Sequence, residues 1–502
     1  RKSIIKLGKH WDTSLEAYSR PDAVLCRLGL SGALQFECTQ HLFHPSLMDC
    51  AVNSGTFMNG RGFYLPYYYN NIQLFRAIPN EFYVYIHLKD TPSKELQKFD
   101  IQVISIEGEV ICEISDYIVK RVNEETNNLY TIDWKLTNLS QTAALENISY
   151  LILGDSDSQL VTRLAELSHS VTLIEDSHDF EKMKKKMENW LGSPGNHHVI
   201  LSFGVSQSLK DIKNFYQAIQ FIAQLRLKAN KFRLSIIIRR GDLVNEDQSR
   251  VNAYENMKSG MGKVLAKEVF SNNIQLIDID EETDLKLLTD ELSGQEGAYY
   301  VAFRGNKRYQ QILRPLETPQ KSYKIKKGVY LITGGLGGIG QQIVKSLVSS
   351  GSIIIAVGKR SAETRIGLIT EFKRLANKEN SEFIYYQVDV TKKSEVRDVL
   401  KEIKNLYGDL TGVFHAAGVA VGGYIHSLSY QQYLKDVSVK VEGANNLYEF
   451  TQSSELDFFV NFSSVNSLIG AIGQVDYVSA NAYLDVFPYT CKKQPLDCSL
   501  KV

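Results

Sequence analysis

The sequence predicts an α/β protein in which two α/β units with parallel sheets follow a smaller antiparallel sheet wrapped on one helix. Three observations predict this class. Aromatic-rich, strand-like runs fill residues 1–123, strands alternate with helices over residues 124–325, and the alternation recurs more strongly over residues 326–502. Strand–helix alternation is typical of parallel sheets. At roughly 100–200 residues per domain, the 502 residues accommodate three such units.

The first region, residues 1–123, contains runs that predict half-buried strands. Residues 81–88 and 101–106 alternate apolar and polar side chains or nearly do so, and residues 63–69 form a third run. Residues 45–52 instead predict a short helix, because Pro45 suits the first helical turn.

The second region, residues 124–325, predicts a scaffold that cannot bind a nucleotide. Its buried strands are expected at residues 149–154, 199–203 and 234–238, with a helix through residues 160–167. The first strand runs into Asp155 and Asp157, whose carboxylates would repel a pyrophosphate, and the glycines of a phosphate loop are missing. The lysine-rich run 182–186 is interpreted as a solvated helix face.

The third region, residues 326–502, opens with a glycine loop between a strand at residues 328–332 and an apolar-faced helix that Gly351 terminates. Glycines allow a tight turn and a close approach to a pyrophosphate, which the helix N-terminus attracts. The strand–loop–helix context favours dinucleotide binding over a tight turn without ligand. The loop consists of Thr333, Gly334, Gly335, Leu336, Gly337, Gly338, Ile339 and Gly340.

The residues after the next strand, 353–357, predict the cofactor. An NAD site would place an acidic residue there, whereas this chain has Lys359, Arg360 and Ser361. Cations favour a 2′-phosphate and hence NADPH, although an exposed charged loop is the alternative. Asp389 follows the third strand and is expected either to meet the adenine or to cap a helix.

Further small and polar residues predict where chemistry occurs. Ala416, Ala417 and Gly418 follow a strand and would let a nicotinamide lie against the sheet edge. A strand at residues 457–462 ends at Ser464, and Tyr477 and Asn481 share one helix face.

These motifs together resemble the ketoreductases of modular type I polyketide synthases, a branch of the short-chain dehydrogenases. The matching pieces are the glycine loop, His-Ala-Ala-Gly-Val at 415–419, Phe-Ser-Ser-Val at 462–465 and the segment 473–481. Most short-chain dehydrogenases carry Lys four residues after the Tyr; here Asn481 stands there and Lys440 lies in the preceding helix. Residues 127–322 resemble the structural subdomain of such ketoreductases. The resemblance implies two tandem Rossmann-like subdomains, structural and catalytic.

The resemblance also implies a reaction and a role for each residue. A β-ketoacyl thioester on an acyl carrier protein, carried by phosphopantetheine, would be reduced by NADPH, with Tyr477 giving a proton to the carbonyl oxygen. A phenol of ordinary pKa about 10 needs a nearby cation, which Lys440 would supply. Ser464 would position the carbonyl, and Asn481 would link Lys440 to a hydrogen-bond network. The alternatives are a core Tyr, a surface Lys and a strand-end Ser in a catalytically silent scaffold.

The first region resembles the second half of a polyketide synthase dehydratase, a hotdog fold, through Phe-His-Pro-Ser-Leu-Met-Asp at 43–49. The resemblance makes Asp49 a catalytic residue, with a helix-turn carboxylate in a remnant domain as the alternative. The first half, which carries the partner histidine, is absent, and His41 and His44 belong to the second-half motif. We therefore expect no dehydratase activity from this chain alone.

Composition excludes several other classes. With 57 basic and 57 acidic residues there is no global field for nucleic acid, and no apolar run reaches the length of a membrane span. The six cysteines form no CxxC pair, which argues against a zinc site and favours a reducing, cytoplasmic compartment. We expect a piece of a larger synthase that works beside neighbouring synthase domains and without a metal. The Lys-rich and Asn-rich composition favours a synthase of the trans-acyltransferase kind.

The sequence also bears on stereochemistry and completeness. One ketoreductase class carries Leu-Asp-Asp where this chain has Ala420-Val421-Gly422, and the opposite class carries Trp where Ile469 stands. Absence of the carboxylate favours the L-hydroxy product.

A ketoreductase normally continues with two strands and a lid helix, so the end at Ser499–Val502 is expected to fall within or before the next strand.

Overall fold

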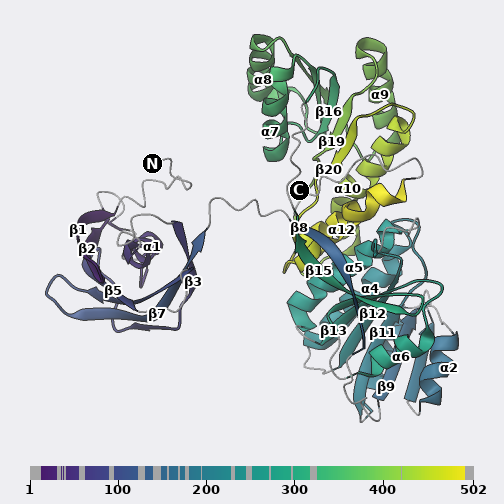
Figure 1. The fold of residues 1–502 in the computed structure, drawn as a ribbon, viewed down its shortest axis with the longest axis horizontal. Coiled ribbons are helices and arrows are strands. Elements are labelled where there is room, and N and C mark those ends of the chain that lie inside the picture. Colours follow the sequence, from purple (N-terminus) through teal and green to yellow (C-terminus); the bar gives the residue numbers. More distant parts are fainter. Residues whose placement is uncertain are drawn as a thin grey trace. The chain divides into compact units, whose positions relative to one another are not determined.

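The computed structural model divides into two compact units, residues 1–128 and 129–502, shown in Figure 1. It describes residues 13–30, 35–36, 38, 41–55, 63–89, 95–122, 130–139, 148–154, 158–167, 170–175, 180–193, 195–227, 232–244, 251–270, 273–294, 298–316, 325–419 and 421–491. Asp155, Asp157, Ala420 and the chain end at 499–502 lie outside these ranges.

The described part of the first unit is an antiparallel sheet with one helix, as predicted. Its strands follow the order β1-β2-β5-β6-β7-β3, and β4 also pairs with β7. The alternating runs bury one face, so that Phe82, Val84 and Ile86 of β5 share a core with Leu47 and Ala51 of the helix. The elements are β1 (Ser14–Arg20), β2 (Ala23–Gly29), α1 (Pro45–Asn53), β3 (Phe63–Tyr68), β4 (Asn71–Leu74), β5 (Glu81–Lys89), β6 (Leu96–Ile104) and β7 (Val110–Val122).

The structural subdomain opens the second unit with an eight-stranded sheet in the order β10-β9-β11-β12-β13-β14-β15-β8. The strands from β10 to β14 are parallel, whereas β15 and β8 extend the sheet in antiparallel pairs that the sequence did not predict. Its strands are β8 (Tyr130–Thr137), β9 (Ile148–Gly154), β10 (Ser170–Glu175), β11 (Asn196–Ser202), β12 (Arg233–Arg239), β13 (Ile274–Ile279), β14 (Tyr300–Arg304) and β15 (Lys307–Pro315).

The helices of this subdomain confirm the predicted alternation. They are α2 (Ser158–Glu166), α3 (Phe180–Leu191), α4 (Ile212–Leu227), α5 (Ala253–Leu265) and α6 (Leu285–Ser293), and α5 continues into a π-helical turn, η4 (Ala266–Phe270). The lysine-rich run lies on α3, where Lys185 and Lys186 are exposed and Met183 is buried, as expected for a solvated face.

The catalytic subdomain is a five-stranded parallel sheet in the order β18-β17-β16-β19-β20, a doubly wound arrangement with β16 at its centre. The strands are β16 (Val329–Thr333), β17 (Ile353–Gly358), β18 (Glu382–Gln387), β19 (Gly412–His415) and β20 (Phe458–Asn461). The helices are α7 (Gly338–Leu347), η5 (Val348–Ser350), η6 (Glu363–Arg365), α8 (Ile366–Lys378), α9 (Lys393–Tyr407), α10 (Tyr430–Thr451), α11 (Asn466–Ile469) and α12 (Val475–Thr490).

The two subdomains of the second unit share one hydrophobic core. Phe215 and Tyr216 of α4 belong to the same buried cluster as Tyr433 of α10 and Val478 of α12. Helices α5 and α12 approach closely, because a Cβ at Gly260 would lie 3.0 Å from the Cα of Ser479. Such contact lets the structural subdomain fix the position of α12, which carries Tyr477.

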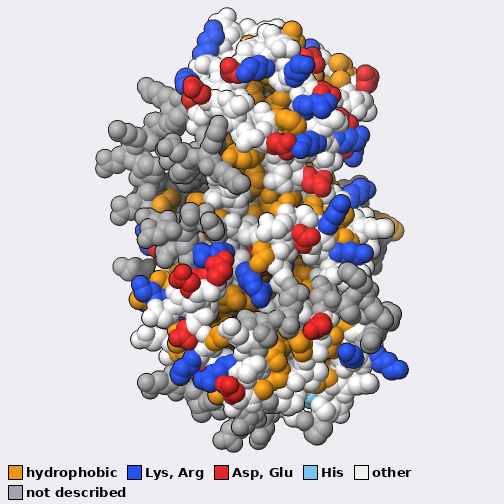
Figure 2. Space-filling model, turned by 90° about the vertical axis from the view of Figure 1, so that its right-hand side faces the viewer, with side chains coloured by type: hydrophobic (Ala, Val, Ile, Leu, Met, Phe, Trp, Pro, Cys, Tyr) orange, Lys and Arg blue, Asp and Glu red, His pale blue; other side chains and the backbone are white. Residues whose placement is uncertain are grey.

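The surface agrees with the balanced composition. Positive and negative side chains are intermixed over the described part of the face in Figure 2, and they do not gather by sign there. None of the helices within the described ranges has the length and apolar character needed to cross a bilayer.

Candidate active site

The glycine loop lies between β16 and α7, as predicted. Gly334 adopts a left-handed φ of 65°, a conformation that other residues rarely accept. A Cβ at Gly340 would lie 2.6 Å from the Cα of Gly335, so that this glycine lets the helix pack on the loop. Gly337, Gly338 and Ile339 are exposed at the helix N-terminus. The Gly337 amide donates to the Gly334 carbonyl at 2.8 Å, so a pyrophosphate would meet the exposed backbone of Gly338 and Ile339.

Two basic residues, Lys359 and Arg360, follow the end of β17. The Lys359 ammonium lies 2.9 Å from a carboxylate oxygen of Asp389, although its side chain is 78% exposed. Arg360 is exposed and forms no ion pair within the described residues. Its carbonyl accepts a 2.6 Å hydrogen bond from the Tyr385 hydroxyl, which fixes the backbone there.

Asp389 closes the turn that leads into α9. Its carboxylate accepts hydrogen bonds from the Thr391 hydroxyl at 2.8 Å and the Thr391 amide at 3.1 Å. These bonds and Lys359 hold the pKa of Asp389 below its usual value despite partial burial. The helix-cap interpretation needs correction, because the N-cap residue of α9 is Lys392. A contact of Asp389 with the adenine stays a prediction.

Lys440 is the buried cation of the site. It lies on α10 with only 6% of its surface exposed, and its ammonium donates a 2.7 Å hydrogen bond to the Phe462 carbonyl. The ammonium lies 5.9 Å from the centre of the Tyr477 ring. Burial lowers the pKa of Lys440 to about 8. A Cβ at Gly418 would lie 3.0 Å from the Lys440 Cε, so the small residues after β19 also make room for this lysine.

Tyr477 and Asn481 lie one turn apart on α12. The Asn481 side-chain amide donates a 2.8 Å hydrogen bond to the main-chain carbonyl of Tyr477. The main-chain carbonyl of Asn481 accepts a 3.1 Å hydrogen bond from the Ser463 hydroxyl. The Asn481 side-chain oxygen is buried and has no hydrogen-bond partner among the described residues. Such an acceptor is expected to meet a donor that completes the site, as a water or ammonium group would.

Ser464 follows Ser463 at the end of β20. It is half-buried, and its hydroxyl accepts a 3.2 Å bond from the Asn466 amide at the start of α11. The hydroxyl therefore keeps its proton free for a carbonyl oxygen. Together with the Lys440 and Ser463 contacts, this places the predicted Ser, Tyr, Lys and Asn at one edge of the sheet.

His415 links the glycine loop to the lysine helix, a role that the sequence did not predict. Its Nδ1 lies 2.8 Å from the Thr333 hydroxyl and its Nε2 lies 3.1 Å from the Lys440 carbonyl. A carbonyl only accepts, so Nε2 carries the proton and Thr333 donates to Nδ1. Burial lowers the pKa of His415 to about 3, which keeps the ring neutral. Gly443 provides the space, because a Cβ there would lie 2.8 Å from the ring.

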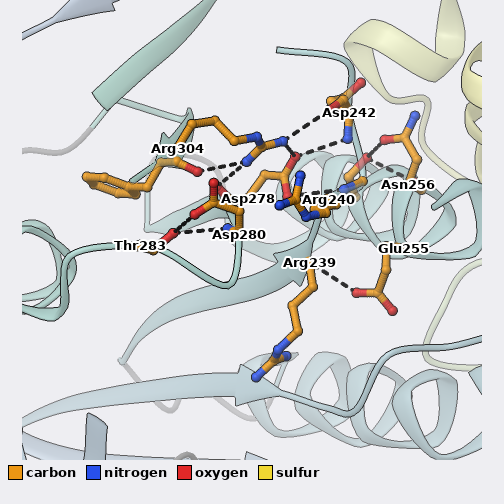
Figure 3. Close-up of polar contacts among 12 residues, drawn as sticks. Arg239, Arg240, Asp242, Glu255, Asn256, Asp278, Asp280, Thr283 and Arg304 are labelled. Carbon is orange, nitrogen blue, oxygen red and sulfur yellow. Dashed lines mark hydrogen bonds and ion pairs between the residues drawn. The ribbon is translucent and has the colours of Figure 1, made fainter. Parts of the chain in front are cut away.

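The corresponding edge of the structural subdomain is occupied by its own charges, shown in Figure 3. Arg304 pairs with Asp278 at 2.8 Å, and the amides of Gly241 and Asp242 also donate to the Asp278 carboxylate. A cavity of about 900 Å³ lies near this edge, lined by Arg239, Tyr254 and residues of α10 and α12, but by none of the predicted cofactor or catalytic residues.

Asp49 lies half-buried on α1 of the first unit, where the Asn53 side-chain amide donates to its carboxylate at 3.0 Å. His44 caps the same helix, since its Nδ1 accepts a 3.3 Å bond from the Ser46 amide. His44 thus has a structural role in helix capping. The catalytic role of Asp49 stays a prediction.

The parallel sheet, the open glycine loop and the Tyr–Lys pair define an oxidoreductase of the short-chain dehydrogenase type. Comparison with protein families agrees: residues 328–498 match the KR domain, and residues 1–128 match the polyketide synthase dehydratase N-terminal domain. The chain is a polyketide synthase segment in which a dehydratase-type domain precedes a ketoreductase domain. KR domains are NAD(P)-dependent oxidoreductases. Because the dehydratase match is described as N-terminal, the assignment of residues 1–123 to the second half stays a prediction.

Individual relatives point the same way. The chain is 23% identical to polyketide synthase PksN of Bacillus subtilis, over 94% of this chain and 8% of the relative. It is 24% identical to PksL of the same organism, over 97% of this chain and 11% of that protein. The chain thus spans about a tenth of the length of these curated relatives.

Solved structures match the fold of the second unit. The first ketoreductase of the tylosin synthase is 24% identical, with a TM-score of 0.61 over 72% of this chain and 78% of that one. A-type ketoreductases from a modular polyketide synthase are 21% identical, with a TM-score of 0.63 over 74% of this chain and 82% of theirs. These likenesses establish the two-subdomain fold.

Proposed function

We propose that the second unit reduces a β-ketoacyl thioester, carried by phosphopantetheine on an acyl carrier protein, to the β-hydroxyacyl thioester with NADPH. The observation that carries the proposal is the buried Lys440 ammonium next to the Tyr477 ring, at the same sheet edge as the open glycine loop. A buried cation is costly, so its presence beside a phenol is typical of a site that handles a developing negative charge.

The proposed roles follow from these contacts. Bound NADPH would supply the hydride. Tyr477 gives its proton to the substrate oxygen, and the Lys440 ammonium stabilises the charge left on the phenol. Ser464 donates to the same substrate oxygen and orients it. The Asn481 side-chain oxygen, which has no hydrogen-bond partner among the described residues, accepts from the network that restores the proton and holds Lys440 in place.

The preference for NADPH over NADH rests on Arg360. Lys359 is already paired with Asp389, whereas the Arg360 guanidinium is exposed and forms no ion pair in the described part of the chain. A guanidinium matches a phosphate with two parallel hydrogen bonds. No acidic residue follows β17 at 359–361 to accept from an NAD ribose.

We also propose the carrier protein and neighbouring synthase domains as partners, and a synthase of the trans-acyltransferase kind. The Bacillus relatives, whose full lengths greatly exceed this chain, support a multidomain setting. No dehydration by the first unit is proposed, because Asp49 would need a histidine from the other half of a dehydratase.

The test is Tyr477→Phe in the whole synthase module. NADPH oxidation at 340 nm with a β-ketoacyl N-acetylcysteamine thioester is expected to fall at least 100-fold, which corresponds to about 3 kcal/mol. NADPH binding should stay unchanged because the glycine loop is untouched. Tyr489→Phe, on the same helix at 37% exposure, is the matched control. An inactive wild type would favour the silent scaffold, and an active Phe variant would refute the assigned acid.

A further inference from the structure

We propose that Glu268 of the structural subdomain is a positioning residue that ties together two loops beside the catalytic residues, 421–428 and 470–474, and thereby sets how the substrate lies. The inference rests on the proposed function. Glu268 lies in the π-helical turn η4 at the end of α5. π-Turns inside helices are frequent at functional positions.

One carboxylate binds both loops. Glu268 accepts a 2.9 Å hydrogen bond from the Ile425 amide through one oxygen and a 3.0 Å bond from the Gly473 amide through the other. These donors lie 157 and 205 residues away along the chain. A carboxylate with one loop on each oxygen fixes the separation of the two loops.

The loops are also joined to each other and to α12. The Gly423 amide donates a 2.7 Å bond to the Gly473 carbonyl, and Gly423 pairs with Gln474 as an isolated parallel bridge. The Gly422 amide donates to Asp476 at 3.2 Å. Gln474 is the N-cap residue of α12, whose first turn carries Tyr477. A shift of the Glu268 carboxylate would therefore move the wall of the site next to the catalytic phenol.

The electrostatics of Glu268 indicate a specific role. Burial raises its pKa, while the two amide hydrogen bonds and nearby His426 oppose that rise. No lysine or arginine forms an ion pair with it among the described residues. A half-buried carboxylate satisfied by backbone amides gives directional bonds whose geometry is fixed, unlike a surface ion pair.

Helix α4 holds the same loop from another direction. The Tyr216 hydroxyl and the Gln220 amide both donate to the Leu428 carbonyl, at 2.9 and 2.7 Å. The Gln224 amide donates to the His426 carbonyl at 2.8 Å. Four side chains of the structural subdomain thus bind backbone atoms of residues 425–428. The structural subdomain therefore holds this loop in a defined position.

The loops carry apolar side chains that an acyl chain could contact. Val421 and Tyr424 are 62% and 51% exposed on one loop, and Ile469 and Ile472 are 53% and 57% exposed in and after α11 on the other side. Their separation decides how tightly a substrate is held and which ketone face is presented. We therefore expect Glu268 to affect substrate binding and stereochemistry more than the proton transfer.

The experiment compares Glu268→Gln with Glu282→Gln, an exposed control in the same subdomain, within the whole module. Glutamine keeps the size but presents an N–H₂ group to one of the two amides. We expect Glu268→Gln to raise KM for the β-ketoacyl thioester at least fivefold and to change the ratio of the two hydroxy epimers at least threefold. NADPH affinity should stay within twofold. Unchanged KM and epimer ratio would overturn the inference.

A second variant and a structural measurement test the inference if Glu268→Gln does not fold or if the wild type is inactive. If Glu268→Gln does not fold, Gln224→Ala, which removes one bond to His426, is expected to shift the epimer ratio in the same direction. Hydrogen exchange at the Ile425 and Gly473 amides should accelerate at least tenfold in Glu268→Gln. This readout needs no turnover, so an inactive wild type would refute the proposed function alone, whereas unchanged exchange would refute the role of Glu268.

Discussion

Replacing Lys440 by Met tests whether the proposed catalytic cation is desolvated. Burial lowers the pKa of Lys440 from 10.5 to about 8, a difference of about 2.5 units. At about 1.36 kcal/mol per unit, the charged lysine opposes folding by about 3 kcal/mol at neutral pH. Methionine has a similar length and no charge, so that penalty disappears in the variant.

The sign of the pH dependence follows from the protons bound in each state. Below pH 8 the lysine is charged in both the folded and the unfolded chain, so the full penalty is present. Between pH 8 and 10.5 the folded chain has released the proton while the unfolded chain keeps it, and the free energy of unfolding therefore rises with pH. From pH 7 to pH 9.5 the wild type should gain about 2 kcal/mol relative to Lys440→Met.

Urea unfolding followed by tryptophan fluorescence measures this difference. Two of the three tryptophans, Trp134 and Trp190, lie in the second unit, so a Trp11→Phe background reports that unit alone. Lys435→Met, an exposed change on the same helix, controls for the general effect of losing a lysine. Equal pH slopes for the wild type and Lys440→Met would show that the ammonium is solvated, and the reasoning about a buried cation would fail.

Three further outcomes test the site. Ser464→Ala should lower kcat about 100-fold with little change in NADPH affinity, measured by stopped-flow single turnover; a normal rate would remove Ser464 from the mechanism. Arg360→Glu should weaken NADPH binding at least tenfold in fluorescence titration and spare NADH, whereas the exposed Lys373→Glu should change neither; equal losses for both cofactors would move the phosphate contact elsewhere. Chiral chromatography should find mainly the L-hydroxy product, and a predominantly D-configured alcohol would contradict the interpretation of Val421 and Gly422.

The local parts of the fold and site could be predicted from the sequence. The glycine loop can be recognised from eight consecutive residues, and the spacing of Tyr477 and Asn481 corresponds to one helical turn. The β-strands of the parallel sheets are continuous apolar runs, which pattern analysis detects well. The antiparallel β8–β15 pair was missed, because its partners are separated by 171 residues at Arg308–Thr137 and no turn joins them.

The functional residues that the sequence analysis missed were missed for a different reason. Glu268, Gln220 and Gln224 act on backbone atoms more than 150 residues away, and a backbone acceptor or donor leaves no residue type to search for. His415 belongs to a motif that the sequence analysis matched. Its role in linking the glycine loop to α10 depends on Thr333 and the Lys440 carbonyl, which only the fold brings together. Of the two interpretations of Asp389, the helix cap is wrong, because its carboxylate accepts hydrogen bonds from Thr391 in the turn and α9 begins after Lys392.

Backbone-directed support by the structural subdomain has a consequence for specificity. Because Glu268 and the α4 side chains bind the main chain of residues 425–428 and Gly473, the exposed side chains of Val421, Tyr424 and Ile472 can change without any of those bonds being lost. The position of the loops and the side chains on them are therefore determined separately. The structural subdomain fixes where the loops lie, whereas the side chains that the catalytic subdomain places on them can vary. An α/β unit whose own sheet edge is filled by the Arg304–Asp278 pair can support the neighbouring site in this way.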